Sequence, residues 1–483
     1  MPTMLLYRQS ERGTANAVNL LSGVWRVPLH QYASGGSLFT RGGSIREVIP
    51  LLSSVPASAN NSAESIDSIL QDALLYIEDE SRSDPVWLEV YSRGEAPRRC
   101  LVLNGYIQPI AEQYSSMFLD AGQVRANLAL LRYAAWENTT ARRIGAGSGS
   151  GASATGGTWL PLAGPPAYTT AAGAGVVSAL GGTMDVPGRG VLPGRIGQIK
   201  FAYSTGNVGK IWAGIRPYRD GYSSFDPAWD VYGASIVDGS GDTVQATSIS
   251  DYIGSGYLAI TPSVTDDLKL RWEFALSDIS ATDHHHFYGA YHLLARYQVP
   301  SGSPSPTPTF GVQFHYGISN LSNLIPNNEV ILDSQEYTKG FWHIQKFGTV
   351  TISPGDRSQR ILDNWTLQCY VEQIGGTGDT LAIDELYLVP ADHYVHIDGT
   401  GLITSSGMHY SVFTHPNDVV MGGRYDSSDD LREPSEVEST NWAVPKGGGT
   451  LVLVGRALTT APSTVELSVS LDVYDRWSSW RHS

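Results

Sequence analysis

The sequence predicts an all-β protein built from β-sandwich domains, with one amphipathic helix in its N-terminal part. The 483-residue chain contains 52 Gly, 26 Pro and 25 Tyr, whereas only 16% of its residues are charged. This composition is typical of short strands that alternate with turns. Hydrophobic residues make up 41% of the chain, which is enough to bury a core in each domain. At about 100–200 residues per domain, the length predicts about three domains.

The first domain is expected at residues 1–142, with its helix at 62–79. Apolar residues recur at helical spacing through that segment, and Asn61 with Glu64 forms a capping pair ahead of them. The segment 123–137 (QVRANLALLRYAAWE) alternates apolar and polar residues, which predicts a half-buried strand. The order of strands, one helix and further strands predicts a β-sandwich with a flanking helix.

A Gly/Ser-rich stretch follows at 143–157 and is expected to be a linker, because Gly and Ser at this density bury little apolar surface. Beyond it, strand-like runs separated by turn residues predict a jelly-roll domain at 251–395. The segments 158–250 and 396–483 carry further strand-like runs. We expect these two segments to form one sandwich, into which the jelly roll is inserted.

Four segments follow one another in the first domain: SAESIDSILQDALLYIED, PVWLEV, RRCLVLNGYIQPI and VRANLALLRYAAWE. Taken together, they resemble the distal tail proteins and related tail-tip proteins of long-tailed, siphovirus-like bacteriophages. In the middle of the chain, LAIDELYLVP and GIRPYRDGYSSFDPAWD resemble carbohydrate-binding-module-like jelly rolls of the galactose-binding type. The two resemblances cover most of the chain and rest on the order of segments rather than on one motif.

The resemblance implies a structural virion protein, synthesised in the host cytoplasm and located in the phage tail. Such proteins form a homo-oligomeric ring, commonly a hexamer, that links the tail tube protein to the tail-tip and hub proteins. The formal charge of −15 disfavours specific nucleic-acid binding, because an acidic surface repels phosphate. DNA is therefore expected only in transit, through an acidic lumen.

The alternative function is that of a glycan-binding adhesin that recognises a host surface polysaccharide; a depolymerase is a third reading. Aromatic rings stack on sugars and Arg binds hydroxyl groups, which makes Trp212, Arg216, Tyr218 and Trp229 candidate glycan-binding residues. The same aromatic residues are also expected in sandwich cores and ring interfaces.

Two places carry metal-ligating residue types. Asp384 is a candidate ligand for a structural calcium ion, because carboxylates suit Ca²⁺, and the alternative is a buried acid that accepts backbone N–H bonds. The run 283–286 (DHHH), with His292 nearby, has ligand chemistry for a transition metal. Three consecutive histidines cannot point the same way on a strand, so we favour a solvated loop there.

The sequence contains no recognisable catalytic constellation, and we therefore expect no enzymatic activity and no cofactor other than the candidate calcium. A GxSxG pattern occurs only in the Gly/Ser-rich stretch, without the strand and helix that a nucleophile needs. No apolar run approaches 18 residues and no secretion signal opens the chain, so no membrane insertion is expected. Cys100 and Cys369 are expected to be separate buried thiols, with a long-range disulfide as the alternative.

Overall fold

The computed structural model confirms the all-β fold class. It describes residues 3–21, 38–39, 43–53, 56–78, 84–91, 96–109, 124–145, 159–161, 177–203, 207–218, 228–230, 235–238, 243–249, 252, 256–260, 270–275, 289–298, 311–319, 328–331, 340, 342–352, 366–374, 380–398, 409–416, 418–426, 428, 430–458 and 467–478. Within these residues nearly every regular element is an antiparallel strand, and a single α-helix is present.

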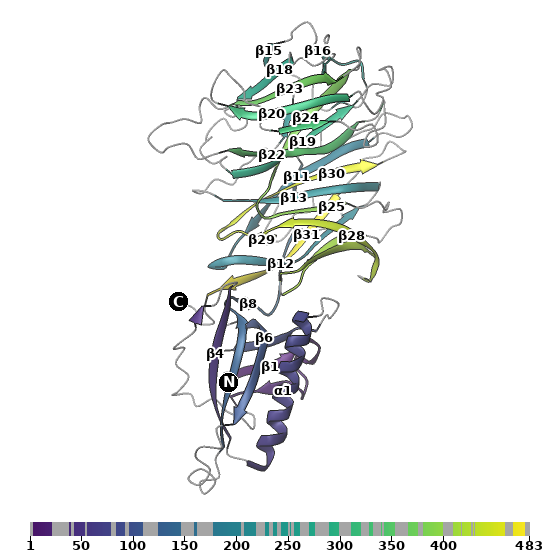
Figure 1. The fold of residues 1–483 in the computed structure, drawn as a ribbon. Coiled ribbons are helices and arrows are strands. Elements are labelled where there is room, and N and C mark those ends of the chain that lie inside the picture. The colour runs from purple at the N-terminus through teal and green to yellow at the C-terminus, as the bar shows by residue number, and fades with distance from the viewer. Residues whose placement is uncertain are drawn as a thin grey trace.

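The first unit combines a strongly bent sheet with one helix (Figure 1). Its elements are β1 (Thr3–Arg8), η1 (Gln9–Glu11), β2 (Val18–Asn19), β3 (Leu38–Phe39), β4 (Ser44–Ser53), α1 (Pro56–Glu78), β5 (Val86–Tyr91), β6 (Arg98–Pro109), β7 (Val124–Tyr133) and β8 (Trp136–Asn138). The helix begins at Pro56 rather than at residue 62, since proline is compatible with a first helical turn. Asn61 therefore lies inside the helix, and its predicted capping role is wrong.

The core of the first unit lies between the helix and the bent sheet. Ile66, Ile69, Leu70 and Ala73 share one helix face and pack with apolar residues of the surrounding strands. The backbone of Gly105 in β6 lies under this face, where an added Cβ would come within 3.1 Å of the Leu70 side chain. The helical spacing read from the sequence thus predicts these four buried positions, whereas Leu74, which continues the same spacing, is 38% exposed.

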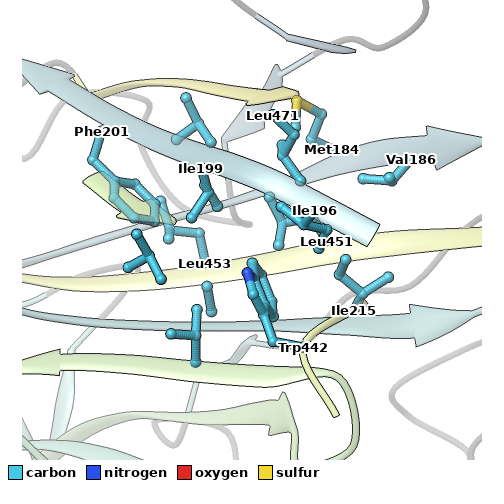
Figure 2. Close-up of a cluster of buried hydrophobic side chains, with 14 of the residues drawn as sticks. Met184, Val186, Ile196, Ile199, Phe201, Ile215, Trp442, Leu451, Leu453 and Leu471 are labelled. Carbon is cyan, nitrogen blue, oxygen red and sulfur yellow. The ribbon is translucent and has the colours of Figure 1, made fainter. Parts of the chain in front are cut away.

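A second sandwich follows. Its elements are β9 (Arg142–Gly145), β10 (Trp159–Pro161), β11 (Val177–Pro187), β12 (Leu192–Tyr203), β13 (Asn207–Pro217), β25 (Tyr394–Asp398), β26 (His409–Thr414), β27 (Val420–Tyr425), β28 (Leu431–Thr440), β29 (Ala443–Val444), β30 (Gly448–Leu458) and β31 (Leu467–Trp477). One sheet runs β10-β11-β30-β13-β25-β28, and the facing sheet runs β9-β31-β12-β26-β27-β28. Apolar side chains from both sheets fill the space between them, with Trp442 among them (Figure 2).

The insertion forms two further sheets at the far end of the molecule from the first unit (Figure 1). Its strands are β14 (Ala228–Asp230), β15 (Ser235–Asp238), β16 (Thr243–Ala246), β17 (Tyr257–Ile260), β18 (Leu270–Ala275), β19 (Gly289–Gln298), β20 (Gly311–Ser319), β21 (Asn328–Ile331), β22 (His343–Ile352), β23 (Thr366–Ile374) and β24 (Leu381–Pro390). One sheet has the order β16-β17-β24-β19-β22, with β14 beside β24, and the other has the order β15-β18-β23-β20-β21.

The chain leaves the second sandwich after β13 and returns to it at β25, and these two strands pair with each other. The insertion therefore extends from residue 218 to residue 393. The sequence placed its start at 251, but β14, β15 and β16 pair with strands of the insertion and belong to it.

Gly214 in β13 is the point where the returning chain crosses the sandwich. A Cβ at this position would lie 2.3 Å from the Pro390 carbonyl oxygen, which is backbone and cannot rotate away. We expect Gly214→Ala to cost about 1–3 kcal/mol of unfolding free energy, as overpacking does, measured by urea denaturation.

Gly194→Ala is the matched control for this prediction. An added Cβ there would first meet a Val473 methyl group, at 3.3 Å, which can shift slightly. Equal costs for the two substitutions would show that the chain crossing over Gly214 is looser than the structure shows.

The first unit and the second sandwich are joined by strand pairing. β8 pairs with β6 of the first unit and also with the end of β31. The segment expected as a linker begins inside strand β9, and its residues 146–157 lie outside the described residues. Since β9 and β10 both belong to the second sandwich, the Gly/Ser-rich stretch connects two strands of one domain rather than two domains.

Candidate functional site: a buried joint and two apolar faces

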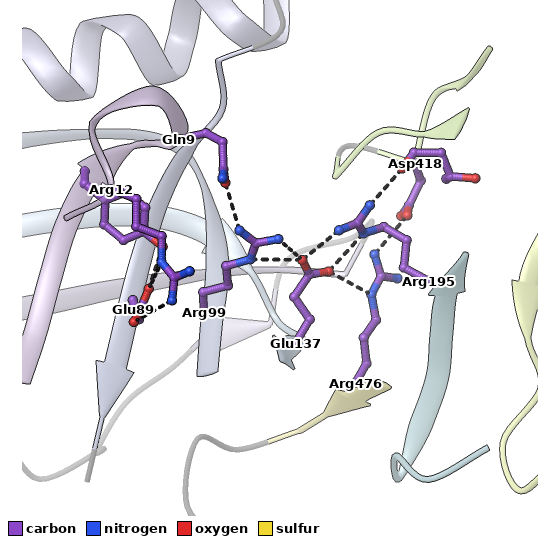
Figure 3. Close-up of polar contacts among 10 residues, drawn as sticks. Gln9, Arg12, Glu89, Arg99, Glu137, Arg195, Asp418 and Arg476 are labelled. Carbon is purple, nitrogen blue, oxygen red and sulfur yellow. Dashed lines mark hydrogen bonds and ion pairs between the residues drawn. The ribbon is translucent and has the colours of Figure 1, made fainter. Parts of the chain in front are cut away.

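The joint between the first unit and the second sandwich is centred on the carboxylate of Glu137. This residue lies on β8, where Arg99 of β6 and Arg476 of β31 are its backbone pairing partners. A third arginine, Arg195, reaches the same carboxylate from β12 (Figure 3). The side chains of Arg99, Glu137 and Arg195 are each at most 5% exposed.

Distances show that Arg195 is the main partner of Glu137. Its Nε lies 2.9 Å from Glu137 Oε2 and its second guanidinium nitrogen 2.7 Å from Oε1, which is a bidentate pair. Arg99 donates to Oε1 at 3.3 Å, and Arg476 Nε lies 3.9 Å from Oε2. Other donors of these arginines bind Gln9 and Asp418, so the cluster continues into both units.

The charge state of the joint follows from this geometry. Burial alone would raise the pKa of Glu137, but Arg195, together with Arg99 and Arg476, holds it below its ordinary value. Burial would likewise lower the pKa of Arg195, and Glu137 overcomes this so that the pKa is raised. Glu137 is therefore ionised at neutral pH, and the three guanidinium groups around its carboxylate come from three different strands.

Aromatic rings support the same arginines. The Arg99 guanidinium lies 3.9 Å from the ring centroid of Trp87 and 5.3 Å from that of Tyr474. Arg98, the neighbouring residue on β6, lies 4.1 Å from the ring of Trp477 at the end of β31. These cation–π contacts tie the last strand of the chain to the first unit.

Two exposed apolar side chains lie on one face of the sheet of the first unit. Val48 on β4 and Tyr106 on β6 both stand opposite Ala129 on β7, so the three residues form one row across the sheet. Val48 is 56% exposed and Tyr106 is 58% exposed, while the alternate residues of the same strands point into the core. The next row along the sheet brings Arg46 and Leu131 to this face. We call this surface the sheet face.

A second apolar patch lies on α1, which flanks the opposite side of the core from the sheet face. Leu74 and Leu75 are 38% and 39% exposed near the end of the helix, and Glu78 follows them. We call this surface the helix face. Because α1 buries its other face in the core, these two leucines are available to contact another protein surface.

The structure buries two of the four predicted glycan-binding residues. Trp212 and Arg216 share one face of β13 and are 2% and 5% exposed. The indole ring of Trp212 stacks on His396, with centroids 5.2 Å apart. Tyr218 is half-buried just after β13, and Trp229 lies in β14 of the insertion, where its side chain is outside the described residues. Trp212 and Arg216 thus have no open face on which a sugar ring could stack.

Asp384, the predicted calcium ligand, is fully buried in β24 and forms an ion pair with Arg296 of β19. His292 is mostly buried in β19, and the run 283–286 lies outside the described residues. Among the described residues, no group of three or more His, Cys, Asp or Glu side chains could hold a metal ion. Cys100 is a free, buried thiol whose pKa burial raises to about 12.

Comparison with known proteins finds a likeness to solved structures alone. No family model matches this chain, and no curated protein matches it. Among solved structures, the chain is similar to the CBM22-1 xylan-binding domain of Xyn10C from Paenibacillus barcinonensis. The identity is 13%, the match covers 39% of this chain and 99% of that domain, and the TM-score is 0.19. A TM-score this low supports no conclusion about fold or ligand. Within the described part of the chain, no helix is long and apolar enough to span a membrane.

Proposed function

We propose that this chain is a structural protein of a phage tail, which forms a ring at the distal tail and links the tail tube to the tail tip. The sheet face is the observation that carries the proposal. Its central row, Val48 and Tyr106, exposes more than half of each side chain on an ordered three-stranded sheet. Apolar side chains on a flat, ordered surface favour contact with a second protein.

The positions of the two apolar faces favour a ring. Because the helix face and the sheet face flank opposite sides of one core, copies of the chain would contact head to tail. Such heterologous contacts close into rings when the rotation between copies is a fraction of a full turn, with six copies for a hexamer. The charges are compatible, since the sheet face carries Arg46 and the helix face carries Glu78.

The joint supports the same function. A ring component has to hold its outer domains at a fixed angle, and the Glu137 cluster ties the second sandwich to the first unit through buried ion pairs. The insertion lies at the end of the molecule farthest from the first unit (Figure 1). A ring of first units would therefore display the insertions away from the ring.

The location in the virion can be tested by immunogold electron microscopy of particles that carry this chain, with antibodies raised against the insertion. Gold particles at the distal end of the tail are the expected result. Label on the capsid, along the whole tube, or only on unassembled protein would contradict the proposal.

A further inference from the structure

The insertion is docked on the second sandwich through a polar seam. Lys346 of β22 lies 3.1 Å from a carboxylate oxygen of Glu438 on β28, which is an ion pair across the seam. The ring of His292, on β19, meets the ring of Tyr394, on β25, edge to face with centroids 4.2 Å apart. The Ile215 backbone N–H donates to the His393 carbonyl at 3.1 Å, where the chain returns from the insertion. We call these contacts, together with His396, the seam.

Two histidine rings lie inside this seam. His292 belongs to the insertion, and its Nδ1 lies 3.0 Å from the Thr349 hydroxyl. His396 belongs to the sandwich, where it stacks on Trp212. Two buried polar atoms of the seam, His396 Nε2 and the Tyr394 hydroxyl, have no hydrogen-bond partner among the described residues. Buried polar groups without a hydrogen-bond partner favour an arrangement in which the insertion is undocked and water reaches them.

We propose that the seam is an acid-sensitive joint, at which proton uptake by His292 and His396 releases the insertion from the second sandwich. The docked arrangement buries both rings, whereas an undocked insertion would expose them to water. Proton uptake and undocking are therefore linked. The proposal concerns the regulation of the insertion and does not depend on ring formation.

The charges that face His396 come from four strands and partly cancel. Asp398 on β25 and Glu438 on β28 favour its protonated form, while Lys210 on β13 and Lys346 on β22 oppose it. Burial is the largest influence and disfavours the charged ring, so the pKa of His396 falls to about 4.

His292 behaves in the same way. Burial is the main reason why the pKa of His292 falls to about 4. Lys346 and His396 also oppose protonation of His292, whereas Glu438 favours it. The Glu438 carboxylate that holds Lys346 also lies 3.8 Å from His396 Nδ1. A protonated His396 would therefore compete with Lys346 for the ion pair that crosses the seam.

The lowered pKa values of His292 and His396 determine how docking of the insertion depends on pH. Above pH 6.5, the ordinary value, both histidines are neutral in the docked and undocked states, and docking has its full strength. As the pH falls from 6.5 towards 4, undocked histidines bind protons that docked ones do not, and docking weakens. With pKa values of about 4 docked and 6.5 in water, linkage weakens docking by up to about 30-fold per histidine at pH 5.

Hydrogen–deuterium exchange of the full chain at pH 7 and pH 5, corrected for the intrinsic exchange rate, tests this inference. We expect protection of β13, β19 and β25 to fall at least about tenfold at pH 5, while β7 of the first unit keeps its protection. In the double variant His292→Phe/His396→Phe, which keeps both ring contacts, the fall should be less than about twofold. Each single variant should show an intermediate fall, which keeps the test valid should the double variant not fold.

His409→Phe is the control, since His409 is a buried histidine on β26 that stacks on Tyr425, away from the seam. The His409→Phe variant should lose protection of β13, β19 and β25 at pH 5 to the same extent as the wild-type chain. Unchanged protection of the wild-type seam at pH 5 would overturn the inference. An equal loss of protection at pH 5 in the wild-type chain and in the His292→Phe/His396→Phe variant would also overturn the inference.

Discussion

Replacing Glu137 by glutamine is expected to lower the free energy of unfolding by about 3–5 kcal/mol, the cost of removing one partner from a buried ion pair. The substitution keeps the size of the side chain but removes the charge that Arg99, Arg195 and Arg476 share. The loss is a large part of the about 5–15 kcal/mol that typically stabilises a folded protein. It is measured by urea denaturation followed by tryptophan fluorescence.

A matched control is Glu433→Gln, which removes the partner of Arg424 in an ion pair whose carboxylate side chain is 44% exposed. Pairs this exposed contribute about 0–1 kcal/mol, so the control should change little. If Glu137→Gln costs no more than Glu433→Gln, the joint does not hold the two bodies together.

Acid is expected to weaken the joint at Glu137, because protonation removes the charge of its carboxylate. The pKa of Glu137 is lowered by its arginine partners, so its contribution is complete above the ordinary value of 4.5. That contribution is lost as the pH falls below 4.5 through the lowered folded value. Undocking at the seam is expected at higher pH, between 6.5 and 4, so the two acid transitions can be separated.

The double substitution Val48→Asp/Tyr106→Asp is expected to abolish self-assembly. Both side chains lie in the central row of the sheet face and point away from the core, so the monomer should fold normally. Carboxylates at these positions would have to be desolvated in any contact that buries the row, which costs several kcal/mol per charge. Sedimentation velocity should show rings for the wild-type chain and monomers for the variant.

Met421→Asp is the control for this prediction. Met421 is also a surface apolar residue, 43% exposed, but it lies on β27 of the second sandwich, away from both faces of the first unit. This variant should still assemble. Assembly of the Val48/Tyr106 variant at the wild-type concentration would show that the sheet face is not the contact surface.

The local parts of this fold could be predicted from the sequence, because periodicity determines which side of an element is buried. The helical spacing of Ile66, Ile69 and Leu70 places them in the core, and the alternation through Val124–Tyr133 separates buried Leu128 from the outward Ala129. The start of the helix could not be located, since Pro56 permits a first turn that the apolar pattern does not mark.

The joint could not be predicted, because its partners are distant in the sequence. Arg195 follows Glu137 by 58 positions, and Arg142 binds Asp475 across 333 positions. The segment 123–137 forms two strands, β7 and β8, rather than the one strand expected, and the sequence could not show that the acid on β8 would be buried beside three arginines. Gly and Ser after residue 145 suggested a flexible break, whereas strand pairing of β8 with β31 bypasses it.

The aromatic residues were ambiguous for a physical reason. Trp and Tyr serve equally in sugar platforms and in buried contacts, and sequence spacing does not distinguish the two. The stacking of Trp212 on His396 beneath the insertion depends on how β13 and β25 pair, which is a long-range property.

Ring formation by the purified full-length chain is tested by its mass and rotational symmetry in electron microscopy of single particles. We expect closed rings, with first units in contact around the axis and insertions displayed away from the ring. A chain that stays monomeric at high concentration, or that pairs in two-fold dimers through the insertion, would contradict it.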